Sequence, residues 1–332
     1  MNNGKPIVLF HVVRTMLPIL VVAWFAFAAA ANGQEFPSKP MKMLVPYVPG
    51  GLVDMMGRNV AQRLSEVLQQ PVVVENRPGA VGAIAIASMK QLPADGYTLI
   101  VMEPAVVITP IVQPKTTYRV NRDLQVVSIV GATPLVLIVN SSLPAQDLKE
   151  LVSLARSKPG GLNYSSAGIG TTLHMAGEML KAQAGIDIVH VPYKGGSAAL
   201  ADLLAGQIQM TFLASTIVSQ YVKDRRVRAI ASTGSKRSPA LPDLPTFAES
   251  GFPNYEVSVW IGLFASRGVP QDVLARLNQA AREIVKREEF RAALRKADIE
   301  PLGTSVQDAQ ALLDREERTW TEIVRANNVK PD

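Results

Sequence analysis

The chain has 332 residues and no cysteine, and 48% of its residues are hydrophobic, 19% charged and 6% aromatic. This is the composition of a soluble α/β protein with room for two cores, and the lack of cysteine excludes a disulfide framework and a lipid-modified cysteine. The formal net charge of +6 is too small and too scattered to indicate a nucleic-acid partner.

An apolar segment near the N-terminus predicts export. Met16–Ala31 carries no charge, follows the basic residues Lys5 and Arg14, and ends in a run of alanines. A basic start, an apolar core and small residues at the end are typical of a secretory signal peptide. A retained membrane anchor is the alternative, but the run is shorter than the ~20 residues that a spanning helix needs. We therefore predict a cleavable signal peptide over residues 1–33 and a periplasmic mature protein with a formal charge of +6 − 2 = +4.

A glycine turn follows the first predicted strand. Met41–Val45 has the pattern of a partly buried strand, and Tyr47–Asp54, which comes after it, contains Gly50 and Gly51. The next apolar residues recur at spacings of three and four and share one helical face: Val53, Met56, Val60, Leu64 and Leu68. Glycines let a ligand approach the backbone, and a helix start offers unpaired N–H groups to a carboxylate or phosphate. This strand, turn and helix therefore form a candidate anion site.

The elements that follow continue the alternation. We predict a strand at Pro71–Glu75, a helix at Ala83–Met89 and a strand at Tyr97–Met102. Because three prolines interrupt Glu103–Asp123, we predict a loop with one helical turn there. Leu124–Asn140 is a long apolar run broken at its centre by a glycine and a proline, which favours a strand that crosses from one domain into another.

The middle of the chain repeats the pattern. Its predicted elements are the helix Leu148–Ser157, the strand Asn163–Ser166, the helix Thr171–Ala184, the strand Ile188–Pro192, the helix Ala198–Leu204, the strand Gln209–Leu213, the helix Ile217–Val222 and the strand Val227–Ser232. Gly168–His174 places a second glycine turn between a strand and a helix, and Tyr193–Ser197 places a third. Each of the first two loops alone is also consistent with a tight turn without a ligand, since neither has a P-loop or dinucleotide-binding signature. Together they indicate a ligand held from two sides.

A second crossing precedes the C-terminal helices. The proline-rich segment Ser235–Asn254 leads to Tyr255–Ala265, a long strand that we predict to cross back. The chain then ends in three amphipathic helices, Asp272–Lys286, Glu289–Lys296 and Val306–Ala326.

Two crossings predict two α/β domains, each with a mainly parallel sheet flanked by helices. The first domain is discontinuous, 36–135 with 258–332, and the second, 136–257, is inserted into it. The ligand is expected in a cleft between them, which is a preferred place for small-molecule sites.

The chain after the leader lacks the patterns of an active site. It contains two histidines, His174 and His190, without the spacing of a metal cluster, and Ser165–Gly168 lacks the Gly-x-Ser-x-Gly pattern of serine hydrolases. We interpret both histidines as structural, and Asp54 as bonded to N–H groups of its own loop. We therefore predict that the protein is not an enzyme and uses neither a cofactor nor a metal.

Seven motifs follow one another between Phe36 and Pro331. They are Pro46–Asp54 with Arg58, Val74–Ala80, Ala94–Leu99, Gly168–Glu178, Val189–Gly196, Pro242–Thr246 and Gly268–Pro270. In this order they resemble the motifs of the extracytoplasmic solute receptors of tripartite tricarboxylate transporters, the TctC-like or Bug receptors. One motif alone is weak, whereas the ordered set is specific.

The resemblance implies a flytrap-like, type II periplasmic binding protein that acts as a monomer with the membrane subunits of a transporter. It implies that a ligand carboxylate is held, with bridging waters, between Pro49–Asp54 and Gly168–His174. Together with the residues argued above, the predicted ligand-binding set is Tyr47, Pro49, Gly50, Gly51, Leu52, Asp54, Glu103, Ser166, Gly168, Gly170, Thr171, Thr172, His174 and Lys194.

Three departures from the usual family pattern bear on the ligand. Leu52 and Leu213 replace residues that are usually polar, which favours a less polar pocket and argues against a citrate-type dicarboxylate. Glu103 follows a strand predicted to be parallel to Met41–Val45, so it emerges at the same carboxyl edge as the first loop. There it suits a ligand with an ammonium, amide or hydroxyl donor, unless it turns to solvent or pairs with a lysine or arginine. Leu52 points instead to an aromatic or aliphatic monocarboxylate, and both ligand classes stay open.

The function that we predict is capture of a small carboxylate-containing ligand, an organic acid or an amino acid, for a tripartite tricarboxylate-type transporter. The alternatives are an exported enzyme on the same kind of scaffold and a sensor that feeds a signalling system. The missing catalytic pattern favours the receptor over the enzyme.

Overall fold

The computed structural model describes residues 36–193 and 195–330. The predicted leader lies outside the described residues, and so does Lys194. From Lys39 onward the chain forms one compact unit, and the following description concerns that unit. None of the helices that the structure describes has the length and apolar character that a membrane crossing requires.

Ten strands of the described residues form a continuous mixed sheet. They are β1 (Met41–Val45), β2 (Val72–Asn76), β3 (Thr98–Met102), β4 (Leu124–Val139), β5 (Asn163–Ser166), β6 (Val189–Pro192), β7 (Met210–Ala214), β8 (Arg228–Ser232), β9 (Ser258–Ser266) and β10 (Glu300–Pro301).

Helices of the described residues connect and flank these strands. They are α2 (Leu52–Leu68), η1 (Ala80–Gly82), α3 (Ala83–Met89), α4 (Ala105–Val112), α5 (Val120–Asp123), α6 (Leu148–Ser157), α7 (Thr172–Ala184), α8 (Gly196–Leu204), α9 (Ser215–Lys223), α10 (Gln271–Lys286), α11 (Glu288–Lys296) and α12 (Val306–Ala326).

The first part of the sheet has the predicted parallel core. β1 lies between β2 and β3 and is parallel to both, and β9 then pairs antiparallel with β3. Alternate strand residues face opposite sides, so Leu44 and Ile100 join a core cluster with residues of α3, α4 and α12. On the other side Gly57 of α2 lies against Val45 and Val101.

The second part of the sheet is built in the same way. β5 is parallel to both β6 and β7, while β7 and β8 pair antiparallel with β4. The core cluster on this part gathers residues of β4, β7, α8 and α9, among them Val136, Leu203 and Val218. The long strands thus add antiparallel pairs to two parallel cores, and the two-domain flytrap class predicted from the sequence is confirmed.

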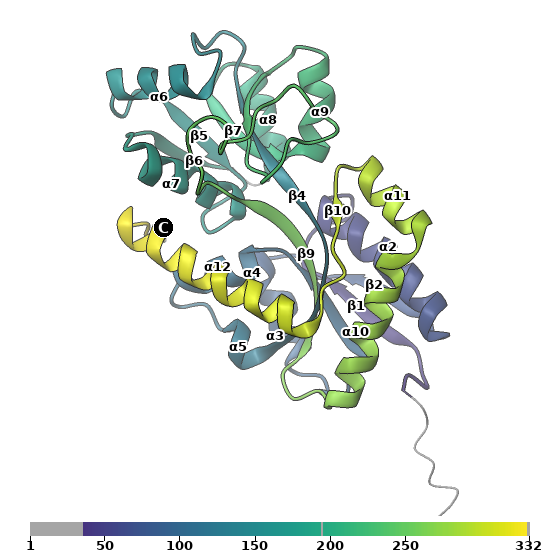
Figure 1. Cartoon of the computed structure of the whole chain (residues 1–332). Helices are drawn as coiled ribbons and strands as arrows, with labels where there is room; N and C mark the ends of the chain where they lie inside the picture. Colours follow the sequence, from purple (N-terminus) through teal and green to yellow (C-terminus); the bar gives the residue numbers. More distant parts are fainter. Residues whose placement is uncertain (1–35, 194, 331–332) are drawn as a thin grey trace, which may run out of the picture. The chain divides into compact units, whose positions relative to one another are not determined.

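β4 is the predicted crossing strand, and it runs beside β9 (Figure 1). Its residues up to Pro134 pair with β9, and its residues from Leu135 pair with β7. Gly131 is needed here because a Cβ at this position would lie 2.9 Å from Ile299 and 3.0 Å from the carbonyl oxygen of Glu300. The glycine that interrupts the apolar run therefore admits β10 to the edge of β4 instead of ending the strand.

The segment Glu103–Asp123 differs from the sequence prediction. Instead of a loop with one turn, it contains the two helices α4 and α5. Pro104 occupies the N-cap of α4, where its missing N–H costs nothing, and Pro110 lies inside the helix. Most residues of α4 are apolar and buried. Tertiary burial therefore outweighs the helix-breaking tendency of proline, and the helix places Glu103 at its start.

Candidate ligand site

The first glycine loop ends β1 and starts α2. Val48, Pro49, Gly50 and Gly51 are exposed, and Tyr47 and Leu52 on either side are half-buried. Gly51 is the N-cap of α2, and because it is a glycine it has no side chain that could accept from the N–H groups of the first turn. Because the first N–H groups of a helix have no partner within the helix, this start can donate to an anion.

The buried Asp54 side chain holds this loop through hydrogen bonds and an ion pair. Gly50 N–H donates to its Oδ2 at 3.0 Å, Asn76 Nδ2 donates to its Oδ1 at 2.7 Å, and Arg58 pairs with it at 3.0 Å. The Arg58 hydrogen bond is the main cause that lowers the pKa of Asp54 to about 2. Local bonding of Asp54, as interpreted from the sequence, is confirmed. Asn76, which also donates to the carbonyl oxygen of Tyr47 at 3.0 Å, was missed, although it ends the strand next to β1.

The second glycine loop joins β5 to α7. Gly168 N–H donates to Ser166 Oγ at 3.0 Å, and the Thr171 hydroxyl donates to the Gly168 carbonyl at 2.7 Å. Thr171 also caps α7 by accepting from the His174 N–H. Gly168 and Gly170 have φ of +125° and +79°, a region that favours glycine. The loop is therefore held in one shape by its own residues.

The two histidines, His174 and His190, form hydrogen bonds with residues of the second loop and of the strand before it. Gly170 N–H donates to His174 Nδ1 at 3.2 Å, and the His174 and His190 rings stack with centroids 4.0 Å apart. Ser166 Oγ and His190 Nε2 form a hydrogen bond of 2.7 Å. Burial lowers the pKa of His174 to about 4 and that of His190 to about 3, so both rings are neutral at neutral pH. The structural interpretation of both histidines agrees with these contacts.

Glu178 anchors the helix that carries this loop. Its carboxylate accepts from Tyr164 OH at 2.7 Å, Lys181 Nζ at 3.1 Å and Asn327 Nδ2 at 2.7 Å. Asn327 follows α12, which packs on α4 and also contacts α7 (Figure 1). The C-terminal helix therefore links the second loop to the helix that begins next to Glu103.

Glu103 brings the two loops together. Tyr47 OH donates to its Oε1 at 2.7 Å, and the Thr172 hydroxyl donates to its Oε2 at 2.8 Å. The side chain is only 8% exposed and makes no ion pair with a described lysine or arginine. Both alternatives considered from the sequence, exposure to solvent and pairing with a cation, are therefore wrong for the described residues. Burial raises the pKa of Glu103, although these hydrogen bonds oppose the rise.

The helix α4 faces the second loop. A Cβ at Gly170 would lie 3.8 Å from Thr109 Cα and 3.8 Å from Val112 Cβ, both on α4. Thr109 and Tyr118 are buried, and their hydroxyls make no hydrogen bond of normal geometry to a described residue. The sequence carried no signal for these two side chains, because their positions depend on a helix that was read as a loop.

The two leucines noted in the sequence have different surroundings. Leu52 lies at the start of α2, next to the exposed first loop. Leu213 is 1% exposed and belongs to the core cluster of the second part of the sheet. Its side chain packs under Gly196 at the start of α8, and the expectation that Leu213 makes the pocket less polar stays a prediction.

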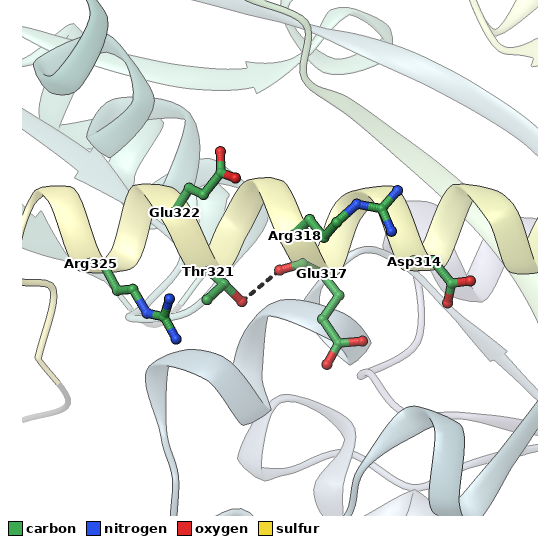
Figure 2. Close-up of a pocket in the computed structure, with 6 residues that line it drawn as sticks. All are labelled: Asp314, Glu317, Arg318, Thr321, Glu322 and Arg325. Carbon is green, nitrogen blue, oxygen red and sulfur yellow. Dashed lines mark hydrogen bonds between the residues drawn. The ribbon is translucent and has the colours of Figure 1, made fainter.

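A separate hollow of about 350 Å³ lies along α12 (Figure 2). The described residues that line it all belong to α12 and are mostly charged: Asp314, Glu317, Arg318, Thr321, Glu322 and Arg325. None of the residues predicted to bind ligand is among them. We therefore do not place the ligand site there.

Comparison with known proteins agrees with the fold. The family model described as tripartite tricarboxylate transporter family receptor matches residues 56–329. The UPF0065 protein in the tcbD-tcbE intergenic region of Pseudomonas sp. (strain P51) is 35% identical over 312 residues, which cover 94% of this chain and 93% of that protein.

Two solved structures with bound carboxylates are similar to the chain. One is described as R. palustris Rpa4515 with adipate and has a TM-score of 0.81 and 33% identity, covering 90% of this chain and 100% of that one. The other, MatC (Rpa3494) from Rhodopseudomonas palustris with bound malate, has a TM-score of 0.77 and 29% identity, covering 87% and 100%. The chain therefore belongs to the receptor family of the tripartite tricarboxylate transporters, a family of periplasmic solute-binding proteins.

Proposed function

We propose that the protein is a periplasmic receptor that binds a small carboxylate-containing ligand between the loops Pro49–Asp54 and Gly168–His174. The observation that carries this proposal is the position of Glu103, whose carboxylate accepts hydrogen bonds from Tyr47, just before the first loop, and from Thr172, within the second loop. The start of each helix, α2 and α7, can offer N–H donors to a carboxylate. The adipate and malate of the similar structures support the ligand class.

We further propose how the protein is exported, with which partners it acts and how its domains are divided. The leader over residues 1–33 exports the chain, and the mature protein acts as a monomer with the membrane subunits of a tripartite transporter. The domains are 36–135 with 258–332, and 136–257. N-terminal sequencing of the exported protein should find a start near residues 32–34, whereas recovery of Met16–Phe27 in the membrane fraction would contradict a cleaved leader.

A thermal-shift screen of the mature protein tests the ligand class. The panel contains dicarboxylates such as adipate and malate, aromatic and aliphatic monocarboxylates, and amino acids, with neutral sugars as the control. A ligand at about a hundred times its Kd adds about 2.7 kcal/mol to the stability. We expect at least one carboxylate to raise the melting temperature. Stabilisation by sugars alone would contradict the proposal.

The variant Gly51→Val tests where that ligand binds. Gly51 has φ of −82°, and no atom lies within 4 Å of an added Cβ, so the fold should tolerate the change. The new side chain lies at the N-terminus of α2 and blocks close approach to it. We expect the affinity found in the screen to fall at least about tenfold, or about 1.4 kcal/mol, in calorimetry.

The control for this variant is Ala292→Val, which places the same valine side chain on the exposed face of α11, far from both loops in the chain. Gly170→Val is a poorer test, because its φ of +79° strains any side chain. Unchanged affinity of a folded Gly51→Val protein would remove the first loop from the site.

A further inference from the structure

We propose that Glu103 determines the specificity of the site and selects ligands that carry an ammonium group beside their carboxylate, so that amino acids bind more tightly than the corresponding deaminated acids. This inference rests on the proposed function and narrows its ligand class. It is carried by the contacts of Glu103, by the charges around it and by two buried, poorly bonded hydroxyls nearby.

The Glu103 carboxylate is buried without a cation among the described residues. Its donors are the hydroxyls of Tyr47 and Thr172 and the N–H of Ala105, all of them neutral groups. A carboxylate has about four acceptor positions, so these three donors leave room for another. Removing a carboxylate from water without an opposite charge is costly, and a ligand ammonium at this place offsets that cost.

The other titratable groups that act on Glu103 add no positive charge. They are the phenols of Tyr47 and Tyr118 and the carboxyl group of Glu316. An anionic ligand without a cationic group is opposed by Glu103, since like charges at close range repel each other. The same carboxylate attracts a ligand that carries an ammonium.

The position of Glu103 fits the arrangement of charges in an amino acid. Thr172 is the first residue of α7, and Tyr47 immediately precedes the exposed first loop. The ligand carboxylate accepts from the N–H groups at the helix starts, and the ammonium, one carbon away, lies toward Glu103. The helix-start N–H groups thus bind the carboxylate of the ligand, and the neighbouring Glu103 binds its ammonium.

Two buried hydroxyls next to this place are poorly bonded. Thr109 and Tyr118 are 1% and 0% exposed, and their hydroxyls interact with each other, but neither makes a hydrogen bond of normal geometry to a described residue. Thr109 faces Gly170 of the second loop, and Tyr118 is close enough to Tyr47 to contribute to the rise of the Tyr47 pKa. Since an unsatisfied buried polar group costs about 1–3 kcal/mol, a polar ligand here also completes their bonding.

The test uses three matched pairs of acids that differ only in the amino group: aspartate and succinate, glutamate and glutarate, and 2-aminoadipate and adipate. Calorimetry measures the affinity of the mature protein for all six. For at least one pair we expect wild-type protein to bind the amino acid ten or more times more tightly. Glu103→Gln removes the charge at nearly constant shape and should lower that ratio at least tenfold.

The control Glu322→Gln makes the same change of net charge at an exposed position on α12 and should leave the ratio unchanged. Equal losses for both members of a pair in Glu103→Gln would show a merely structural role and overturn the inference. If Glu103→Gln does not fold, the test rests on the wild-type protein alone, through its affinity ratio for each of the three pairs. Preference for the deaminated acids overturns the inference but leaves the proposed function intact. Binding of none of the six acids also overturns it, and the wider screen then decides whether the proposed function stands.

Discussion

Replacing Gly177 with alanine is expected to destabilise the protein by about 3 kcal/mol. Gly177 is a buried residue of α7, and a Cβ at this position would lie 2.0 Å from Cε2 of Tyr164. The Tyr164 ring has no room to move away, because it is fully buried, lies against His190 and donates through its hydroxyl to Glu178. Urea denaturation, which gives the free energy of unfolding, measures the effect.

The sign of this effect is informative. In an exposed helix, alanine is about 1 kcal/mol more favourable than glycine, so a site with free space would be stabilised by the change. The control is Gly51→Ala, at a position where no atom lies within 4 Å of the added Cβ and φ is negative. Because alanine is a poorer N-cap than glycine, we expect the control to lose at most about 1 kcal/mol of stability. A Gly177→Ala protein as stable as wild type would show that α7 does not pack on Tyr164 as described.

Replacing Glu316 with glutamine is expected to stabilise the protein at pH 8 but not at pH 4. Glu316 lies on α12, and burial is the main cause that raises the pKa of its carboxyl group to about 7, although the Trp320 N–H donates to it. A carboxyl group whose pKa is raised on folding binds protons more strongly in the native protein than in the unfolded one. Stability therefore falls as the pH rises from about 4.5 to about 7 and stays low above that.

The size of the expected effect follows from the shift of the pKa. The rise of the Glu316 pKa from its ordinary value of 4.5 to about 7 corresponds to a loss of up to about 3 kcal/mol of stability at pH 8. Glutamine keeps the shape without the charge, so its unfolding free energy should not show this fall. Chemical denaturation at pH 4, 6 and 8 measures it, with the exposed Glu322→Gln as the control. Parallel pH profiles for wild type and Glu316→Gln would contradict a raised pKa.

The local patterns of the sequence predicted most helices and strands. The bounds of β1, α3, α6, β5 and α12 agree with the prediction residue for residue. In α2 the apolar spacing identified the buried face, and in β4 the length of the apolar run identified the strand that passes from one part of the sheet to the other. These features depend on neighbours in the chain, and such neighbours are visible in a sequence.

The short-range chemistry of the loops was also predictable. Asp54 lies four residues from Gly50 and from Arg58, and Thr171 lies three residues from His174, so their hydrogen bonds arise within one turn of chain. The helix α4 was missed for the opposite reason. Its prolines disfavour a helix locally, and only burial of its apolar residues in the core stabilises it.

By itself, the sequence determined the strand and helix pattern, the two glycine turns and the family motifs, because each of these is encoded by residues that are close together in the chain. Only the tertiary structure decided where Glu103 points. It joins Tyr47, 56 residues earlier, to Thr172, 69 residues later, through hydrogen bonds that need both loops in place. Likewise, the burial of Leu213 and the burial of the hydroxyls of Thr109 and Tyr118 depend on contacts between elements that are distant in sequence. Such contacts follow from the packing of the whole chain and not from the pattern of any one segment.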